Sequence, residues 1–280
     1  MIIGVDLGGT FIKAGLVDNG RILRKIAKPT EAEKGKQRVI RNVLDCIAEL
    51  QSDKVESVGI GSPGQIDHTK GVVLNSSNLQ ISNVNFPGII LQELNLPAKI
   101  DNDANCFALG EFLHGAGEGA RNMVGITMGT GIGSGVIIDC RLYTGRNAAA
   151  ELGHTVIKHN GEMCACGRKG HLEAYTGTRG IQKLFGKKLS PEDIFKLAAK
   201  RNKNALKTWD SVGNYLGVGI ANAIHTYDPD VVVIGGSVAK AWRFFSKSMM
   251  KTVNELSLLP KTKIVKASLA DAGVIGAASL

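Results

Sequence analysis

The sequence lacks a run of about 18 apolar residues, so no transmembrane helix is expected. It also lacks a secretory signal, because residues 1–6 read as an apolar strand that ends in an acid. These two absences predict a cytoplasmic protein that does not bind a membrane. Cysteine is scarce, with five in 280 residues. An odd number without a secretory signal argues against a disulfide framework and favours reduced thiols or a metal site.

The formal net charge of +9 raises the question of a nucleic-acid partner. Much of this charge lies in one stretch where basic and apolar residues alternate at roughly helical spacing, as on a solvated helix face. We therefore favour a solvated face over a nucleic-acid surface, and a positive field also suits anionic nucleotides. The basic residues of the stretch are Lys183, Lys187, Lys188, Lys196, Lys200, Arg201, Lys203 and Lys207.

The order of the predicted elements indicates a duplicated α/β fold. Each half of the chain contains a strand hairpin with a glycine-rich turn. No long linker separates the halves, and the join lies near residues 113–120, where glycines alternate with other residues. We expect two lobes, residues 1–114 and 115–280, with a cleft between them and a last helix that can pack back on the N-terminal lobe. The predicted strands are residues 2–6, 11–17, 21–28, 55–61, 123–128, 135–139, 142–143 and 231–234, and the predicted helical regions are residues 31–50 and 191–225.

Two glycine-rich turns are candidates for phosphate binding. The first joins two strands rather than a strand and a helix, which excludes the dinucleotide fingerprint and the Walker loop. Backbone N–H groups of a glycine hairpin can still approach phosphate oxygens, and an acid at the end of the strand can hold Mg²⁺. Together the turns indicate a clamp on a nucleotide. The candidate residues are Asp6, Gly8, Gly9, Thr10, Lys13, Gly129, Thr130, Gly131 and Gly133.

Two carboxylates directly follow another predicted strand. Asp101 and Asp103 flank Asn102 after the largely apolar residues 96–100 and before the helix-like residues 104–111. Open α/β folds usually place their chemistry at such a strand end. The alternative is that these residues only cap a helix, because aspartate and asparagine are good N-caps.

These segments together resemble the ROK sugar kinases, a family within the hexokinase, actin and Hsp70 ATPase superfamily. The resemblance covers nearly the whole chain, and the motifs in this order are highly specific. It implies an α/β, two-lobed actin-like ATPase (ribonuclease H-like) fold with a central cleft that closes on a sugar. It also implies ATP-dependent phosphorylation of a hexose hydroxyl, usually O6. The segments that carry it are Asp6–Thr10, Asn102–Asn105, Gly129–Gly133, Glu151–His154, Cys164–Gly167 and Gly235–Ser237.

Matching the family's motifs position by position implies roles for individual residues. Asp103 matches the general base, which accepts the proton of the attacking hydroxyl. Asn102 matches a sugar ligand beside it. The other matches to sugar-binding positions are Gly64, Asn78, Glu151, His154 and Glu173, and the matches to the turn beside the adenosine are Gly235 and Gly236.

The segment from residue 154 to residue 171 has the composition of a zinc knuckle, because thiolates and imidazoles suit tetrahedral Zn²⁺. The resemblance implies one histidine and three cysteines, whereas this chain has His171 at the fourth position; His159 is the weaker substitute. A zinc ion here would be structural and would fix the nearby sugar-binding residues. The alternative is a loop with two reduced thiols and no metal. The candidate ligands are His154, Cys164, Cys166 and His171.

The resemblance favours glucose as the substrate, converted to glucose 6-phosphate. Kinases of N-acetylglucosamine and N-acetylmannosamine carry very similar segments, so these sugars are the alternative. A sugar-sensing regulator is disfavoured, because ROK repressors carry a helix-turn-helix domain ahead of this core and here the phosphate-loop strand begins at Ile2. The expected partners are a small sugar and ATP, and a homodimer or homotetramer is expected.

Overall fold

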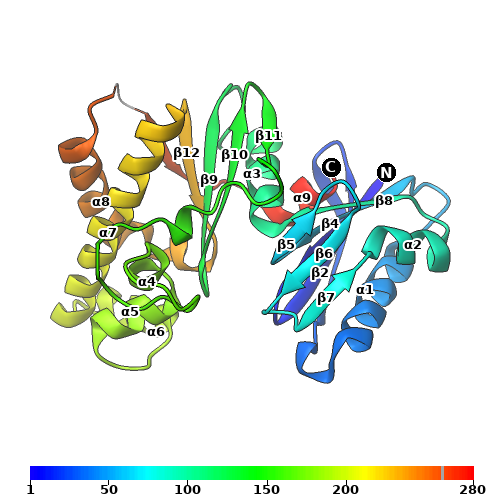
Figure 1. Ribbon diagram of the computed structural model, residues 1–280, viewed down its shortest axis with the longest axis horizontal. Helices are drawn as coiled ribbons and strands as arrows, with labels where there is room; N and C mark the ends of the chain where they lie inside the picture. Colours follow the sequence, from blue (N-terminus) through cyan, green and yellow to red (C-terminus); the bar gives the residue numbers. More distant parts are fainter. Residues whose placement is uncertain (260–261) are drawn as a thin grey trace. The chain divides into compact units, whose positions relative to one another are not determined.

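The computed structural model describes residues 1–259 and 262–280, in which strands and helices alternate (Figure 1). Among these residues, no helix combines the length and the apolar character needed to cross a bilayer. The strands are β1 (Ile2–Leu7), β2 (Phe11–Asp18), β3 (Arg21–Pro29), β4 (Ser57–Ser62), β5 (Gln65–Asp67), β6 (Val72–Ser76), β7 (Ile81–Val84), β8 (Ala98–Asn102), β9 (Met123–Met128), β10 (Ile132–Ile138), β11 (Arg141–Tyr143), β12 (Val231–Gly235) and β13 (Lys263–Lys266). The α-helices are α1 (Lys36–Leu50), α2 (Phe86–Leu94), α3 (Asp103–His114), α4 (Glu173–Thr176), α5 (Thr178–Phe185), α6 (Pro191–Ala199), α7 (Lys203–Tyr227), α8 (Trp242–Leu256) and α9 (Ala272–Ala277).

Two mixed sheets have matching strand arrangements. The first has the order β3-β2-β1-β4-β8, in which β1 pairs antiparallel with β2 and parallel with β4. The second has the order β11-β10-β9-β12-β13, in which β12 pairs parallel with both β9 and β13. The predicted α/β class is confirmed. The third sheet, β5-β6-β7, is not predicted from the residue pattern, because its strands are short and lack a clear alternation.

Two helical regions differ from their expected bounds because of their backbone conformation. Helix α1 begins at Lys36 rather than at residue 31, since Glu31 has a φ of 54° and Gly35 a φ of 91°. The region expected over residues 191–225 is two helices, α6 and α7. Between them Arg201 has a φ of 60°, which no α-helix accommodates.

The chain groups into two compact units. The first comprises Met1–Ala120, Gly135–Ala150 and Ala267–Leu280, and the second comprises Arg121–Ser134 and Glu151–Lys266. The units interleave along the chain, whereas the predicted lobes, residues 1–114 and 115–280, are continuous. The lobe boundaries stay a prediction.

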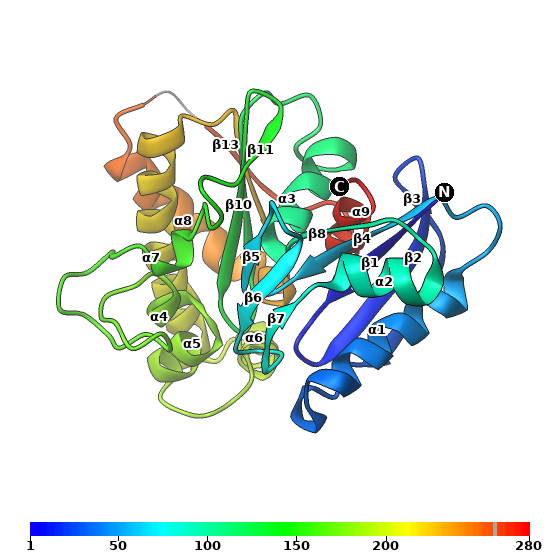
Figure 2. The same cartoon turned by 45° about the vertical axis from the view of Figure 1, so that its right-hand side comes forward.

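One face of the first sheet carries the core of the first unit. Alternate residues of β1, namely Ile3, Val5 and Leu7, are fully buried in one apolar cluster with α1 residues such as Val39 and Val43. Helix α1, drawn in blue, lies along this sheet (Figure 2). Since side chains alternate between the faces of a strand, the residues between these three point to the opposite face.

The opposite face of the first sheet packs against α9, which also packs against α3. A Cβ at Gly4 of β1 would overlap the carbonyl oxygen of Val274, and one at Gly59 of β4 would overlap that of Ala277. Glycine at these positions therefore lets the helix backbone approach the strands. This packing supports β1 and β4, whose carboxyl ends carry two of the predicted site loops.

Gly59→Ala should lower the free energy of unfolding by about 3 kcal/mol, because the added methyl group can only fit if α9 moves away from β4. Gly61→Ala is the matched control in the same strand. Its Cβ would lie 3.1 Å from the Cys106 sulfur, a side-chain atom that can shift, so we expect a loss of about 1 kcal/mol or less. Urea denaturation measures the free energy of unfolding of both variants. Equal losses of stability would show that the close contact with α9 does not cause the effect of Gly59→Ala.

Candidate functional site

The carboxyl ends of three parallel strands meet at one edge of the first sheet. Asp6 of β1 lies in register with Gly61 of β4, and Ser62 of β4 lies in register with Asn102 of β8. The turns that follow these strands therefore leave the sheet at the same edge, where open α/β sheets place their binding loops. Within the first unit, the structure thus brings the predicted phosphate turn, the loop with Gly64 and the Asn102-Asp103 pair to one edge.

Asn102 and Asp103 have different tasks at the start of α3. Asn102 is the N-cap, because its backbone is extended and its Oδ1 accepts from the Ala104 N–H at 2.9 Å. Its Nδ2 donates to the Gly64 carbonyl at 3.3 Å, which connects two of the predicted sugar-binding residues. Asp103 is the first helical residue, and its Oδ1 also accepts from Ala104 N–H at 2.9 Å. The helix-cap interpretation therefore applies mainly to Asn102.

The turn between β1 and β2 holds the first pair of glycines in a hairpin. The Gly8 N–H donates to the Phe11 carbonyl at 3.0 Å, and a Cβ at Gly8 would lie 2.8 Å from that oxygen. A Cβ at Gly9 would lie 3.5 Å from the Asn78 carbonyl oxygen. The turn joins two strands as predicted, and it lies beside another predicted sugar-binding residue, Asn78.

Asp6 and Lys13 are cross-strand partners in this hairpin. Burial raises the pKa of the Asp6 carboxyl, the charge of Lys13 lowers it, and the charge of Asp271 raises it. A carboxylate whose ionisation is opposed by burial and by a second acid is stabilised by a bound cation. The surroundings of Asp6 therefore fit the Mg²⁺ that the sequence predicts there.

Two further turns lie side by side in the second unit. Strands β9 and β12 are parallel and in register at Thr127 and Gly235, so their carboxyl ends share one edge. Gly236 has a φ of 88°, and a Cβ there would overlap the Met128 carbonyl oxygen, so this approach requires glycine. A Cβ at Gly129 would lie 3.8 Å from the Ser237 hydroxyl oxygen. The structure thus joins the predicted turn at residues 129–133 to the predicted adenosine turn.

Glu173 connects the second glycine turn to the cysteine-rich segment. Its Oε2 accepts from the Ile132 N–H at 3.0 Å, and its Oε1 accepts from the Cys164 thiol at 3.3 Å. A Cβ at Gly131 would overlap Oε2. The absence of a side chain at Gly131 therefore lets the carboxylate reach the turn.

The segment with Glu151 and His154 also contacts the start of β10. It forms a short 3₁₀ helix, η2 (Leu152–His154), in which the Leu152 N–H donates to the Ser134 hydroxyl at 3.1 Å. A Cβ at Gly153 would overlap the Ile132 carbonyl oxygen. Because Ile132 also donates to Glu173 Oε2, Glu173 and the segment that carries Glu151 and His154 contact the same strand start.

The four predicted metal ligands come together. One ligand atom from each of His154, Cys164, Cys166 and His171 lies within 4.8 Å of the others. Cys164 Sγ is 3.9 Å from His154 Nδ1, and Cys166 Sγ is 3.3 Å from His171 Nδ1. Tetrahedral zinc with bonds of about 2.0–2.3 Å places its ligand atoms about 3.3–3.8 Å apart. The donor set and its spacing therefore fit Zn²⁺ after small adjustments.

Metal binding in this cluster requires Cys164 to lose a proton. Burial raises the pKa of the Cys164 thiol to about 12, and the hydrogen bond to Glu173 adds to this effect. A bound divalent cation would stabilise the thiolate that burial opposes. Burial also lowers the pKa of the His171 imidazole, which keeps the ring neutral, as a metal ligand must be.

The two ring nitrogens of His154 face different partners. Nδ1 faces Cys164, whereas Nε2 lies 4.0 Å from Glu151 Oε2. A carboxylate near the second nitrogen commonly orients a metal-binding histidine. His154 can therefore hold the metal through Nδ1 and interact with a sugar hydroxyl through Nε2, which is consistent with both roles expected from the sequence.

Two threonines support the glycine turns but are not among the residues predicted from the sequence. Thr30 Oγ1 donates to the Gly8 carbonyl at 2.6 Å, and Thr178 Oγ1 donates to the Gly129 carbonyl at 2.9 Å. Each hydroxyl fixes the backbone of one glycine turn. Both residues lie outside the turn motifs, so motif spacing carries no signal for them.

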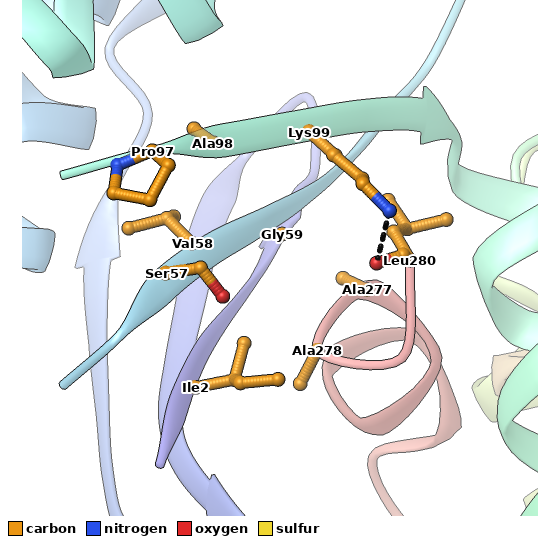
Figure 3. Close-up of a pocket in the computed structure, with 10 residues that line it drawn as sticks. All are labelled: Ile2, Ser57, Val58, Gly59, Pro97, Ala98, Lys99, Ala277, Ala278 and Leu280. Carbon is orange, nitrogen blue, oxygen red and sulfur yellow. Dashed lines mark hydrogen bonds between the residues drawn. The ribbon is translucent and has the colours of Figure 1, made fainter.

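A pocket of about 260 Å³ lies at the amino-terminal ends of β1, β4 and β8 (Figure 3). Its lining is mostly apolar and includes Ile2, Ser57 and Ala98, and at its side Lys99 Nζ donates to the Leu280 backbone oxygen at 3.1 Å. None of the candidate residues named above lines it. The pocket is therefore separate from the carboxyl-end edge of the sheet.

Comparisons with known proteins support the expected fold. The model of the ROK family matches residues 2–280. A glucokinase from Thermotoga maritima is 37% identical over 100% of this chain and 96% of the relative. A xylose repressor from Caldicellulosiruptor bescii is 28% identical over 98% of this chain and 76% of the relative. The structure of a ROK glucokinase from Streptomyces griseus, in complex with glucose and AMPPNP, matches with a TM-score of 0.88 at 29% identity over 99% of this chain and 98% of that one. The actin-like ATPase fold predicted from the sequence is confirmed.

Proposed function

The chain belongs to the ROK family, and we propose that it is an ATP-dependent hexose kinase that converts glucose to glucose 6-phosphate. The observation that carries this proposal is the shared edge of the first sheet, where Asp103 and the glycine turn after β1 both lie. A proton acceptor and a phosphate-binding turn at one edge are the two parts that phosphoryl transfer requires. The glucokinase relatives and the ROK glucokinase structure support the same activity.

The protein's tasks in this reaction are positioning and neutralisation of charge. We assign Asp103 as the group that accepts the proton of the attacking hydroxyl. We assign binding of the phosphate oxygens to the glycine turn after β1, with Thr10 and Lys13. Mg²⁺ held through Asp6 would supply positive charge to the phosphates. The residues assigned to the nucleotide in the second unit are Gly129, Thr130, Gly131, Gly133, Gly235 and Gly236.

We assign recognition of the sugar to the residues that match the family's sugar-binding positions. A hexose presents hydroxyl groups in several directions, so its binding needs convergent acceptors and donors. Carboxylates, amides, an imidazole and backbone groups supply them. The assigned residues are Gly64, Asn78, Asn102 and Asp103 of the first unit and Glu151, His154 and Glu173 of the second.

We assign a structural role to the zinc ion that His154, Cys164, Cys166 and His171 would hold. A cysteine must lose its proton to bind zinc. The Cys164 thiol then no longer donates to Glu173 Oε1, so this oxygen becomes available to a sugar hydroxyl. Loading of the metal would therefore prepare Glu173 for the sugar.

A sugar-sensing regulator is the second candidate function, because xylose repressors are also similar to this chain. The kinase is favoured, since the glucokinase relative is 37% identical and the repressor 28%. N-acetylglucosamine and N-acetylmannosamine are the alternative substrates. A cytoplasmic location fits the use of ATP, and the homodimer or homotetramer stays a prediction.

A substrate panel tests the proposal directly. With Mg²⁺ and ATP, we expect sugar-dependent release of ADP that is fastest with glucose among the aldohexoses, fructose and the N-acetylhexosamines. If ADP release is fast only with an N-acetylhexosamine, the kinase proposal holds but the substrate is that sugar rather than glucose. If no sugar in the panel stimulates ADP release, the kinase proposal fails and the regulator becomes the better candidate.

A further inference from the structure

The ring of His68 lies between two oxygen atoms in the first unit. His68 follows β5, and its Nδ1 lies 3.4 Å from Oδ2 of Asp101, a buried residue of β8. Its Nε2 lies 3.2 Å from the carbonyl oxygen of Asn147. The ring therefore connects three segments: the turn after β5, the end of β8 and the loop between β11 and Glu151.

The number of protons on His68 and Asp101 follows from the groups that the two ring nitrogens face. A carbonyl oxygen can only accept, so Nε2 must carry a proton to bind Asn147. A neutral imidazole has only one N–H, and its Nδ1 would then turn a lone pair toward the Asp101 carboxylate. The contact is attractive only if one more proton lies on His68 or on Asp101. The two side chains therefore share a proton.

The burial of Asp101 favours retention of this proton, whereas its hydrogen bonds oppose it. Its Oδ1 already accepts from the Asn102 N–H at 2.6 Å and from Asn105 Nδ2 at 2.7 Å. Burial raises the pKa of the Asp101 carboxyl, opposed by the Asn105 hydrogen bond, the His68 charge and the Asn102 N–H.

Two further carboxylates lie near this pair. On α3, Asp103 is a second carboxylate, and the charges of Asp101 and Asp103 help burial to raise the pKa of the Cys106 thiol. On the turn that carries His68, Asp67 pairs with Lys70 at 3.9 Å. A negative surrounding retains protons.

We propose that His68 and Asp101 are positioning residues, whose shared proton holds the strand end that carries Asn102 and Asp103. The inference rests on the proposed kinase function, because Asp103 is the assigned proton acceptor. Asp101 directly precedes Asn102, and its Oδ1 fixes the backbone N–H of that residue. Loss of the shared proton would free the turn and misplace the reacting carboxylate, and a misplacement of about 1 Å can cost about 10² in rate.

The Asp101→Asn variant separates the effect of the shared proton from the effect of the side chain's hydrogen bonds. The amide Nδ2 can donate to Nδ1 of neutral His68, while the amide oxygen keeps the two hydrogen bonds from Asn102 and Asn105. As the pH rises, this variant should therefore keep its kcat, whereas the wild-type kcat should fall about fivefold when the shared proton is lost. His68→Ala should lower kcat about tenfold at every pH, with the KM for ATP little changed. Parallel pH profiles of the wild type and Asp101→Asn would overturn the proposal.

Hydrogen exchange tests the positioning without any activity. In His68→Ala, amides of residues 101–105 and of residues 144–150 should exchange faster than in the wild type. The matched control is His225→Ala, which removes another hydrogen-bonded histidine, one whose ring accepts from the Leu258 N–H; it should leave both segments unchanged. Unchanged exchange in His68→Ala would overturn the positioning role even if the chain phosphorylates sugars. Faster exchange in a chain that phosphorylates no sugar would instead reject the kinase proposal alone.

Discussion

Asp103→Asn should lower kcat by about 10² or more and leave the affinity for the sugar largely unchanged. An amide can still hydrogen-bond to the hydroxyl, so binding is retained. It cannot take up the hydroxyl proton, so the transfer step loses its base. Steady-state kinetics with glucose and ATP, together with direct measurement of glucose binding, separate the two effects.

Asn102→Ala is the control for Asp103→Asn, because it tests the loss of the helix cap without the loss of the base. Asn102 is the N-cap of α3, so Asn102→Ala should lower the free energy of unfolding by about 1 kcal/mol. Asp103→Asn keeps an oxygen that can accept from Ala104 N–H, so its stability should stay near that of the wild type. Near-normal kcat in a folded Asp103→Asn variant would contradict the assignment of the base, and attention would pass to Asp101.

The location of the candidate site could be predicted because strand ends are visible in sequence. An apolar run that stops at Asp6, or at Asp101-Asn102-Asp103, shows where a buried strand leaves the sheet. Parallel pairing then brings such ends to one edge. The cluster of candidate metal ligands could be predicted for a related reason, since these residues lie close together in one segment of the chain.

The residues that hold the candidate site residues in place could not be predicted, because they come from distant parts of the chain. His68 is one histidine in a turn, and no periodicity connects it to Asp101. The residue pattern predicts a helix from residue 31, whereas positive φ angles at Glu31 and Gly35 delay the start of α1 to Lys36. Such features depend on backbone conformation and tertiary contacts rather than on residue pattern.

One zinc ion per chain is the second expected result, measured by elemental analysis of protein purified without a chelator. The ligands would be Nδ1 of His154 and His171 and the sulfur atoms of Cys164 and Cys166. Two thiolates balance the charge of Zn²⁺, so the ion adds little net charge near the sugar-binding residues. Since the thiols must lose protons, a chelator should remove the metal more easily in mild acid.

Cys166→Ala should release the metal, whereas Cys140→Ala should retain it. Both residues are exposed free cysteines, but only Cys166 belongs to the ligand cluster, so the pair separates loss of a ligand from loss of a thiol. Without the metal, Cys164 keeps its proton and its hydrogen bond to Glu173 Oε1, and no metal bond fixes Nδ1 of His154. Sugar affinity should therefore fall by about tenfold or more, and nucleotide affinity should change less.

His171→Cys completes the test, because it supplies the third cysteine that the resemblance implies at this position. It should keep the metal, since thiolate and imidazole are both good zinc ligands. The buried position of His171 and the 3.3 Å contact of its Nδ1 with Cys166 favour this residue over His159 as the fourth ligand. His159→Ala should accordingly bind zinc as the wild type does. Well under one zinc per chain in the wild-type protein, or equal zinc contents in Cys166→Ala and Cys140→Ala, would leave this segment an ordinary loop with two reduced cysteines.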